Sequence, residues 1–371
     1  MSRLEELKRL IDKYEFDTKR LIELYNEAII IADKENILKE RISLRWKAVQ
    51  EYQSTTKAMT TLKLASELRS IMDEHKMELD NNDILMILDA YNAACRQAYH
   101  YYQIPMPKVL ELQEDFKKIV IENSLSLVEY YDMKISHSMY FDDKEKVEYY
   151  FDKILEIDDN GLNVGCDECY ESFKLDSYLY LDRENECKDF IGKYYNNMLT
   201  CKDAAKNMES IMMTHYAGKG DLDKLKDIIP MAYRSMREDV FFIGNLDIVI
   251  LYYAHEDIER ALNVLEINID KYLVNDSPYV NLRAAMALWI LFEKVKLERD
   301  KTKVELNFPK ELSIYSEGGI YSIDEIIEFF KERSLDLYFK FNERNGGEYG
   351  YGIPKFFCKL LLGKSFDEMY S

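Results

Sequence analysis

Apolar residues recur along most of the chain at spacings of three and four, which place them on one face of an α-helix. Upstream of residue 124 this pattern occurs in four segments, paired around polar or proline-containing breaks: 35–53, 56–77, 81–103 and 107–122. Pro105 and Pro107 mark the second break, because proline stops one helix and is favoured at the start of the next. The first 34 residues predict a further pair. We therefore predict an all-α fold of antiparallel helix pairs.

One fourteen-residue pattern occurs four times further along the chain. It is found in FDDKEKVEYYFDKI, YLYLDRENECKDFI, YAGKGDLDKLKDII and YYAHEDIERALNVL, which begin at residues 141, 178, 216 and 252. Each copy begins with an aromatic residue at the end of one helix and continues through a glycine or polar turn into a second amphipathic helix. A single hairpin cannot bury both of its faces, so the hairpins must stack on one another.

The last two copies resemble the tetratricopeptide repeat family, whose helical hairpins repeat about every 34 residues. The aromatic, glycine or acidic, apolar and small positions of that family are filled by Tyr216, Gly220, Asp221, Leu222 and Ala232 in one copy and by Tyr252, Asp257, Ile258 and Ala261 in the other. Tyr150, Glu184 and Cys187 depart from the pattern in the first two copies. The resemblance implies a right-handed α-solenoid of stacked hairpins over residues 1–300, clearest over about residues 124–275.

The sequence changes character after residue 300. Residues 301–322 contain Pro309 and a glycine pair, which predicts an irregular or briefly extended segment. Ser322 is a candidate N-cap for a long amphipathic helix that ends near Gly346. Residues 353–364 form a short apolar helix that must be buried, over the last repeat or at a dimer surface. We predict that residues 301–371 cap the solenoid, and homo-oligomerisation is left open.

Charge narrows the choice of partner. The formal net charge is -19 with a pI near 4.9, which disfavours nucleic acid as a partner. Acidic residues are concentrated in residues 141–190, which form either a well-solvated surface or a docking site for a basic partner. No apolar run is long enough to span a membrane, and the charged N-terminus does not resemble a signal peptide. We expect a cytoplasmic protein.

The cysteines suggest two alternatives. Cys166 and Cys169 form a CxxC, one half of many zinc sites, but Cys187 and Cys201 lie fourteen residues apart and do not form the other half. Cys187 also occupies a core position of the repeat. We therefore expect small buried side chains plus a thiol pair at a helix start, with no metal or cofactor. A metal or redox role is the alternative.

Motifs for catalysis are absent from the sequence. It contains no glycine-rich phosphate loop, no nucleophile elbow and no histidine pair at metal-ligand spacing. Arg69 and His75 loosely resemble the short motif of HEPN-type ribonucleases, but their acidic surroundings suit RNA poorly. We predict that the protein is not an enzyme.

The resemblance to tetratricopeptide repeats implies that the first helix of each pair lines a concave face that binds a peptide or protein segment. On this face the candidate contact residues are Asp176, Asn207, Ser210, Thr214, Asn245 and Tyr253. We expect an adaptor or scaffold whose partner is basic or apolar, because the protein is acidic. The alternative is a signal-peptide receptor of the bacterial quorum-sensing type, which such repeats also resemble and which switches an effector when a peptide binds.

Overall fold

The computed structural model describes residues 2–14, 18–53, 57–157, 166–238, 240–299, 302–347 and 350–370. These residues contain eighteen α-helices and only two short strands, and the helices pack in neighbouring pairs. The predicted all-α fold is confirmed. Two compact units divide the chain: residues 1–134 with 156–165, and residues 135–155 with 166–371. Residue 300, where the sequence changes character, falls inside the second unit.

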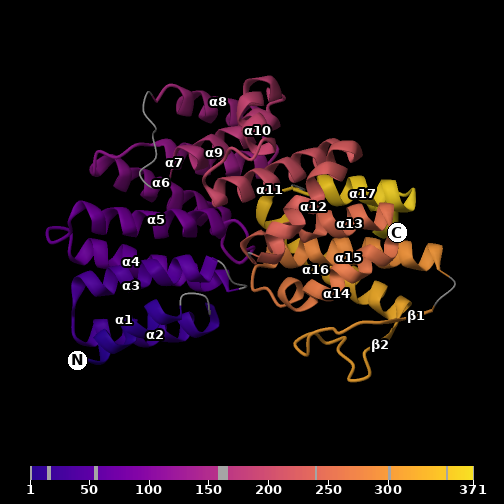
Figure 1. Cartoon of the computed structure of the whole chain (residues 1–371), viewed down its shortest axis with the longest axis horizontal. Coiled ribbons are helices and arrows are strands. Elements are labelled where there is room, and N and C mark those ends of the chain that lie inside the picture. Colours follow the sequence, from indigo (N-terminus) through magenta and orange to yellow (C-terminus); the bar gives the residue numbers. More distant parts are fainter. Residues whose placement is uncertain are drawn as a thin grey trace. The chain divides into compact units, whose positions relative to one another are not determined.

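The first unit is a stack of helices in chain order (Figure 1). They are α1 (Arg3–Lys13), α2 (Thr18–Lys34), α3 (Leu38–Gln53), α4 (Ala58–Glu74), α5 (Asn81–Ala98) and α6 (Met106–Glu122). Each helix packs on the next, and α3 also contacts α5. The six helices match the three pairs that the apolar spacing predicts.

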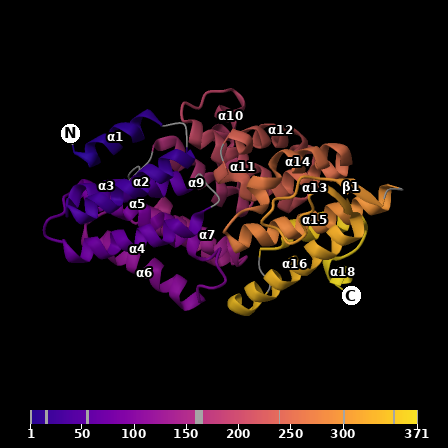
Figure 2. The same cartoon turned by 90° about the horizontal axis from the view of Figure 1, so that it is seen from below.

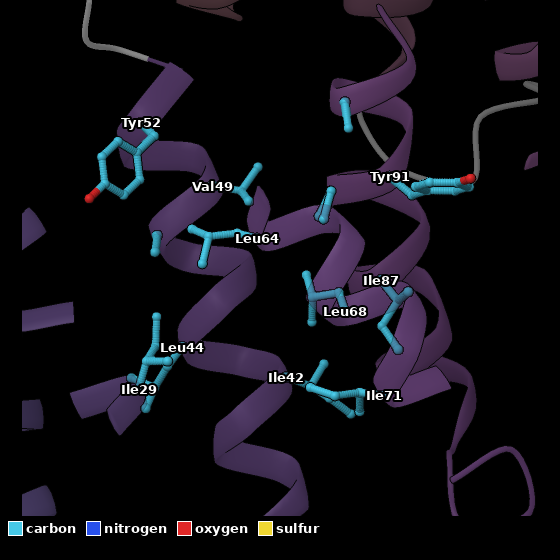
Figure 3. Packing of buried hydrophobic residues seen from close by; sticks show 14 of the residues in the cluster. Ile29, Ile42, Leu44, Val49, Tyr52, Leu64, Leu68, Ile71, Ile87 and Tyr91 are labelled. Atoms are coloured by element: carbon cyan, nitrogen blue, oxygen red, sulfur yellow. The ribbon is translucent and has the colours of Figure 1, made fainter. Parts of the chain in front are cut away.

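Side chains from successive helices fill the core of this unit. Ile42, Leu68 and Ile87 are fully buried and lie between α3, α4 and α5 (Figure 3). Capping fixes some of the helix ends: Asp80 and Asp83 form a reciprocal capping box at the start of α5. The pairs are therefore held by apolar burial between helices whose ends are set locally.

The helix α7 (Val128–Tyr140) crosses from the first unit into the second. It is followed by α8 (Lys144–Leu155), α9 (Asp167–Tyr180), η1 (Glu184–Glu186), α10 (Lys188–Tyr195), α11 (Lys202–Lys219), α12 (Leu222–Glu238), η2 (Val240–Asn245), α13 (Leu246–Glu256), α14 (Ile258–Leu273) and α15 (Pro278–Glu298). The helices α9, α11, α13 and α15 contact one another in sequence order. We call these four helices the first-helix row: α9, α11 and α13 each begin a repeat, and α15 follows the last repeat.

The turns of these repeats agree with the sequence pattern. Tyr216 and Tyr252, the aromatic residues that open the last two copies, are buried at the ends of α11 and α13. Gly220 ends α11 with φ +69°, a left-handed conformation that glycine adopts without steric cost. In the last copy Asp257 instead caps α14, and its carboxylate accepts hydrogen bonds from the backbone of Glu259 and Arg260.

The C-terminal segment covers the row. Strands β1 (Lys303–Glu305) and β2 (Ile320–Ser322) pair antiparallel, and they are followed by α16 (Ile323–Asn345), α17 (Gly352–Leu362) and α18 (Phe366–Tyr370). Ser322 precedes α16 as predicted, although its side chain makes no capping hydrogen bond, and Gly346 ends that helix. Figure 2 shows α16 beside α15, and these two helices are in contact. The short apolar helix α17 contacts α11, α13 and α15, so its contacts extend beyond the last repeat.

In the part of the chain that the structure describes, every helix is too short or too polar to cross a lipid bilayer.

We expect Gly220→Ala to destabilise the protein more than Gly346→Ala. Both glycines have positive φ, so alanine costs about 1–2 kcal/mol of backbone strain at either position. At residue 220 the added Cβ would also lie 2.7 Å from the ring of Phe356 in α17, whereas at residue 346 it would meet nothing within 4 Å. Overpacking adds about 1–3 kcal/mol, which urea unfolding of both variants would resolve.

The control is to introduce Gly220→Ala into a chain that already carries Phe356→Ala. There the extra cost of Gly220→Ala should disappear, since the opposing ring is gone. Equal destabilisation by the two glycine variants in the wild-type background would show that α17 does not pack tightly against the end of α11.

Candidate functional site

Two of the predicted contact residues are joined in the first-helix row. The side-chain amide of Asn245 donates a hydrogen bond to the Ser210 hydroxyl at 2.7 Å. Its oxygen accepts a bond from the Arg283 guanidinium at 2.8 Å. These contacts connect α11, the start of α13 and α15 through one polar chain.

Arg283 also forms an ion pair with Asp247 in the interior of the row. The two side chains are bound by two parallel hydrogen bonds of 3.0 and 2.8 Å. The carboxylate of Asp247 is fully buried, and only 14% of the arginine side chain is exposed. Desolvation makes such a pair costly to break, since removing one partner leaves the other charge buried. The sequence alone did not indicate this pair, although its 36-residue separation equals a repeat interval.

The other four candidates differ in accessibility. Asp176 on α9, and Asn207 and Thr214 on α11, are half-buried. Tyr253 is 3% exposed, and the Arg260 guanidinium lies 3.9 Å from the centre of its ring. The aromatic ring is therefore part of the packing of α13 and α14. Partner binding by these residues stays a prediction.

The apolar helix α17 of the same chain packs against the row. In α17, Phe357 and Cys358 are fully buried and Leu361 is 5% exposed. The helix contains Lys355 and Lys359 but no acidic residue. Its contacts with α11, α13 and α15 make it the occupant of this part of the row.

Aromatic contacts join the first and last repeats of the second unit. Tyr140 at the end of α7 packs edge-on against Tyr279 of α15, with ring centres 5.4 Å apart. Asn345, at the end of α16, donates a hydrogen bond of 3.1 Å to the Tyr140 hydroxyl. The C-terminal segment thus bridges helices that lie far apart in the sequence.

Acidic residues of the segment 141–190 pair with lysines of neighbouring repeats. Asp182 binds both Lys144 and Lys219, and Glu184 binds Lys224. These pairs are exposed to solvent, so each contributes little to stability. They do neutralise part of the local negative charge. Docking of a basic partner on this segment stays a prediction.

A cluster of three thiols lies at the start of the row. Cys166 is the N-cap of α9, Cys169 lies in the first turn of that helix, and Cys201 is the N-cap of α11. Their sulfur atoms all lie within 4.8 Å of one another, and those of Cys169 and Cys201 are 3.6 Å apart. Cys187 is buried separately, as predicted. The sequence did not reveal the role of Cys201, because its proximity depends on the packing of α9 against α11.

Glu168 holds the two helix starts of this cluster together. Its carboxylate, on α9, accepts hydrogen bonds from the backbone amides of Thr200 and Cys201 at 3.0 and 2.6 Å and from the Thr200 hydroxyl at 3.1 Å. These bonds lower the pKa of Glu168 and favour its ionised form. The approach of Cys201 to the CxxC is therefore fixed by a contact outside the thiols.

The thiols have different proton affinities. The backbone amide of Cys169 donates a hydrogen bond to the Cys166 sulfur, which lowers the pKa of Cys166. Burial and the neighbouring thiols raise the pKa of Cys169 to about 12. Cys166 is exposed, so the cluster is accessible from solvent. Three sulfur ligands in this arrangement are suited to a thiophilic metal ion.

Arg69 and His75 of the first unit bind different carboxylates. Arg69 forms an ion pair with Asp115 at 2.8 Å, and the imidazole of His75 contacts Glu78 at 2.9 Å. The two side chains are thus engaged in structural pairs on α4 and its neighbours. The absence of enzyme activity stays a prediction.

A scan against protein-family models found no matching family, and searches of curated proteins and of solved structures found no match to the chain.

We expect Asp247→Ala to lower the free energy of unfolding by about 3–5 kcal/mol, because it leaves the Arg283 guanidinium buried without its carboxylate. Asp336→Ala is the matched control, since it breaks an exposed pair with Lys340 and should cost less than about 1 kcal/mol. Urea unfolding of both variants gives the comparison. A cost below that of the control would mean that the buried pair contributes nothing to the row.

Proposed function

We propose that the protein is a non-catalytic binding module, a right-handed helical-repeat solenoid whose first-helix row takes an apolar, lysine-bearing helix from a partner protein. The proposal rests on the surface of α11, α13 and α15 against which α17 packs. We call this surface the seat of α17. The chain's own helix contacts three helices of the row, its Phe357 and Leu361 side chains are buried, and it has no acidic residue. A surface that binds this helix is suited to bind, in its place, a partner helix of similar chemistry.

Charge supports the same choice of partner. The net charge of -19 favours approach by a basic segment. In α17, Lys355 is half-buried and Lys359 is exposed, while Phe357 and Leu361 are buried. A partner helix with the same separation of apolar and lysine residues would place its apolar face on the row and keep its lysines near solvent.

The remaining row residues provide directional contacts for such a helix. Asn207 and Thr214 are half-buried polar side chains on α11, thirteen and six residues before Gly220, where the end of that helix packs against α17. Ser210 and Asn245 are already bonded to each other, so they contribute mainly to the shape of the row. Asp176 extends the polar surface onto α9. We assign Asn207 and Thr214 as partner contacts. Ser210 and Asn245 are assigned as positioning residues.

Binding by this route depends on how often α17 leaves its seat. A tethered helix has a high effective concentration, so it competes strongly with a helix in solution. The apparent affinity for a partner is the intrinsic affinity reduced by the fraction of molecules in which the seat is open. Weakening α17 should therefore strengthen partner binding.

A labelled peptide with the sequence of residues 351–364 tests this directly. We expect it to bind the Phe357→Ala chain at least about tenfold more tightly than the wild-type chain. The reason is that a buried Phe→Ala change weakens the packing of α17 against the row by about 3–5 kcal/mol. Fluorescence anisotropy in reducing buffer measures both affinities. Leu361→Ala is a second variant that weakens the same helix with a smaller change in volume.

Two controls separate displacement from general loosening. Phe339→Ala removes a ring of α16 that is 63% exposed, and it should leave peptide affinity at the wild-type value. A peptide carrying the Phe357→Ala change should bind weakly to every chain. Equal binding of both peptides, or equal affinity of wild-type and Phe357→Ala chains, would exclude the row as a seat for external helices.

A further inference from the structure

The three-thiol cluster has the composition and spacing of a metal site. Thiolates are the ligands that zinc and copper(I) prefer, whereas magnesium and calcium bind oxygen. A tetrahedral ion with Zn–S bonds of about 2.3 Å holds its sulfur atoms about 3.8 Å apart. Cys169 and Cys201 already lie at 3.6 Å, and Cys166 lies within 4.8 Å of both. Small side-chain rotations would therefore complete three ligand positions.

The surrounding backbone favours negative charge at this place. Cys166 and Cys201 are N-caps of α9 and α11, which have 14 and 18 residues, so both positive helix ends face the cluster. Helix starts stabilise thiolates for this reason. Three thiolates and one divalent cation carry a net charge of −1, which the two helix ends offset.

The cluster is also preorganised by a residue that is not a thiol. Glu168 lies between Asp167 and Cys169 and binds the backbone on both sides of the bond between Thr200 and Cys201. It thereby holds the start of α11 against the start of α9 before any ion binds. A site whose ligands are held in place loses less conformational entropy on binding.

We propose that Cys166, Cys169 and Cys201 form a zinc site with three protein thiolates and a fourth position open to solvent. Each thiol that binds releases one proton to solvent, and a water molecule or a ligand from outside the chain completes the tetrahedron. Cys166 is the exposed member of the cluster, so solvent can reach the site. The bound ion joins the start of α9 to the start of α11, and so links two successive helices of the row.

A disulfide between Cys169 and Cys201 is the competing chemistry for the same atoms. It requires the sulfur atoms to approach to about 2.05 Å, far closer than their present 3.6 Å, and it leaves Cys166 without a role. A metal ion uses all three thiols at distances near those observed. Three converging ligands therefore favour the metal site over the disulfide.

Zinc titration of the full-length, reduced and metal-free chain tests the proposal. We expect one equivalent of zinc per chain by elemental analysis after removal of free metal. At a concentration of about one hundred times the dissociation constant, zinc should raise the melting temperature by about 3–6 °C, because the ion binds only the folded arrangement. Cobalt(II) in place of zinc should show thiolate-to-metal charge-transfer absorption.

Matched cysteine variants identify the ligands. Cys166→Ser, Cys169→Ser and Cys201→Ser should each weaken zinc binding at least tenfold and reduce the thermal shift. Cys187→Ala removes a buried thiol of the same repeat outside the cluster and should bind zinc as the wild type does. Glu168→Gln should weaken binding less than loss of a thiol, while leaving the cobalt spectrum unchanged.

Three results would overturn the proposal. They are zinc content well below one equivalent in the reduced chain, unchanged affinity in the cysteine variants, and a Cys169–Cys201 disulfide that re-forms in air while the reduced chain takes up no metal. The last result would assign a redox role to the same cluster. None of these outcomes depends on peptide binding, so the zinc site and the helix-binding row are tested separately.

Discussion

Two helices of the second unit are buried around their whole circumference, and the remaining elements of that unit cover them. Every residue of α13 from Leu246 to Ala254 is buried, and α15 is buried without interruption from Ala284 to Phe292. A helix of this kind cannot leave any side facing water. The neighbouring repeats cover part of each helix, and α16 and α17 cover much of the rest. The C-terminal segment is therefore a structural requirement of the two helices beneath it.

This requirement also limits the chemistry of any partner helix that replaces α17 as we propose. Removing it exposes the surface against which Phe357 and Leu361 are buried, and each such side chain contributes about 1.5–3 kcal/mol through its burial. Only an apolar segment can restore this contribution. The lysines of α17 lie in a strongly acidic protein, where an acidic helix would be repelled. Burial and charge thus both favour the apolar, lysine-bearing partner helix that we propose.

The sequence predicts the helices better than the contacts between them. Apolar spacing and turn residues such as Gly220 are local signals, so the helix pairs and most of their ends could be predicted. In the first unit, cross-repeat contacts such as Trp46 to Asp89 and Arg69 to Asp115 span 43 and 46 residues. These intervals exceed the 36 to 38 residues between the four sequence copies, so these upstream contacts do not follow the spacing of those copies. The proximity of Cys201 to the CxxC could not be predicted for a related reason, because it depends on how α11 packs on α9.

Polar contacts join the helices of the row to one another without involving α17. Glu168 connects α9 to α11, Ser210 and Asn245 connect α11 to the start of α13, and Arg283 connects α13 to α15. None of these bonds includes a residue of α17. The buried ion pair in particular resists separation, because both charges would have to be hydrated or left unpaired. In the exchange that we propose, the row would therefore keep its own connections, and the proposed zinc ion would strengthen the contact between α9 and α11.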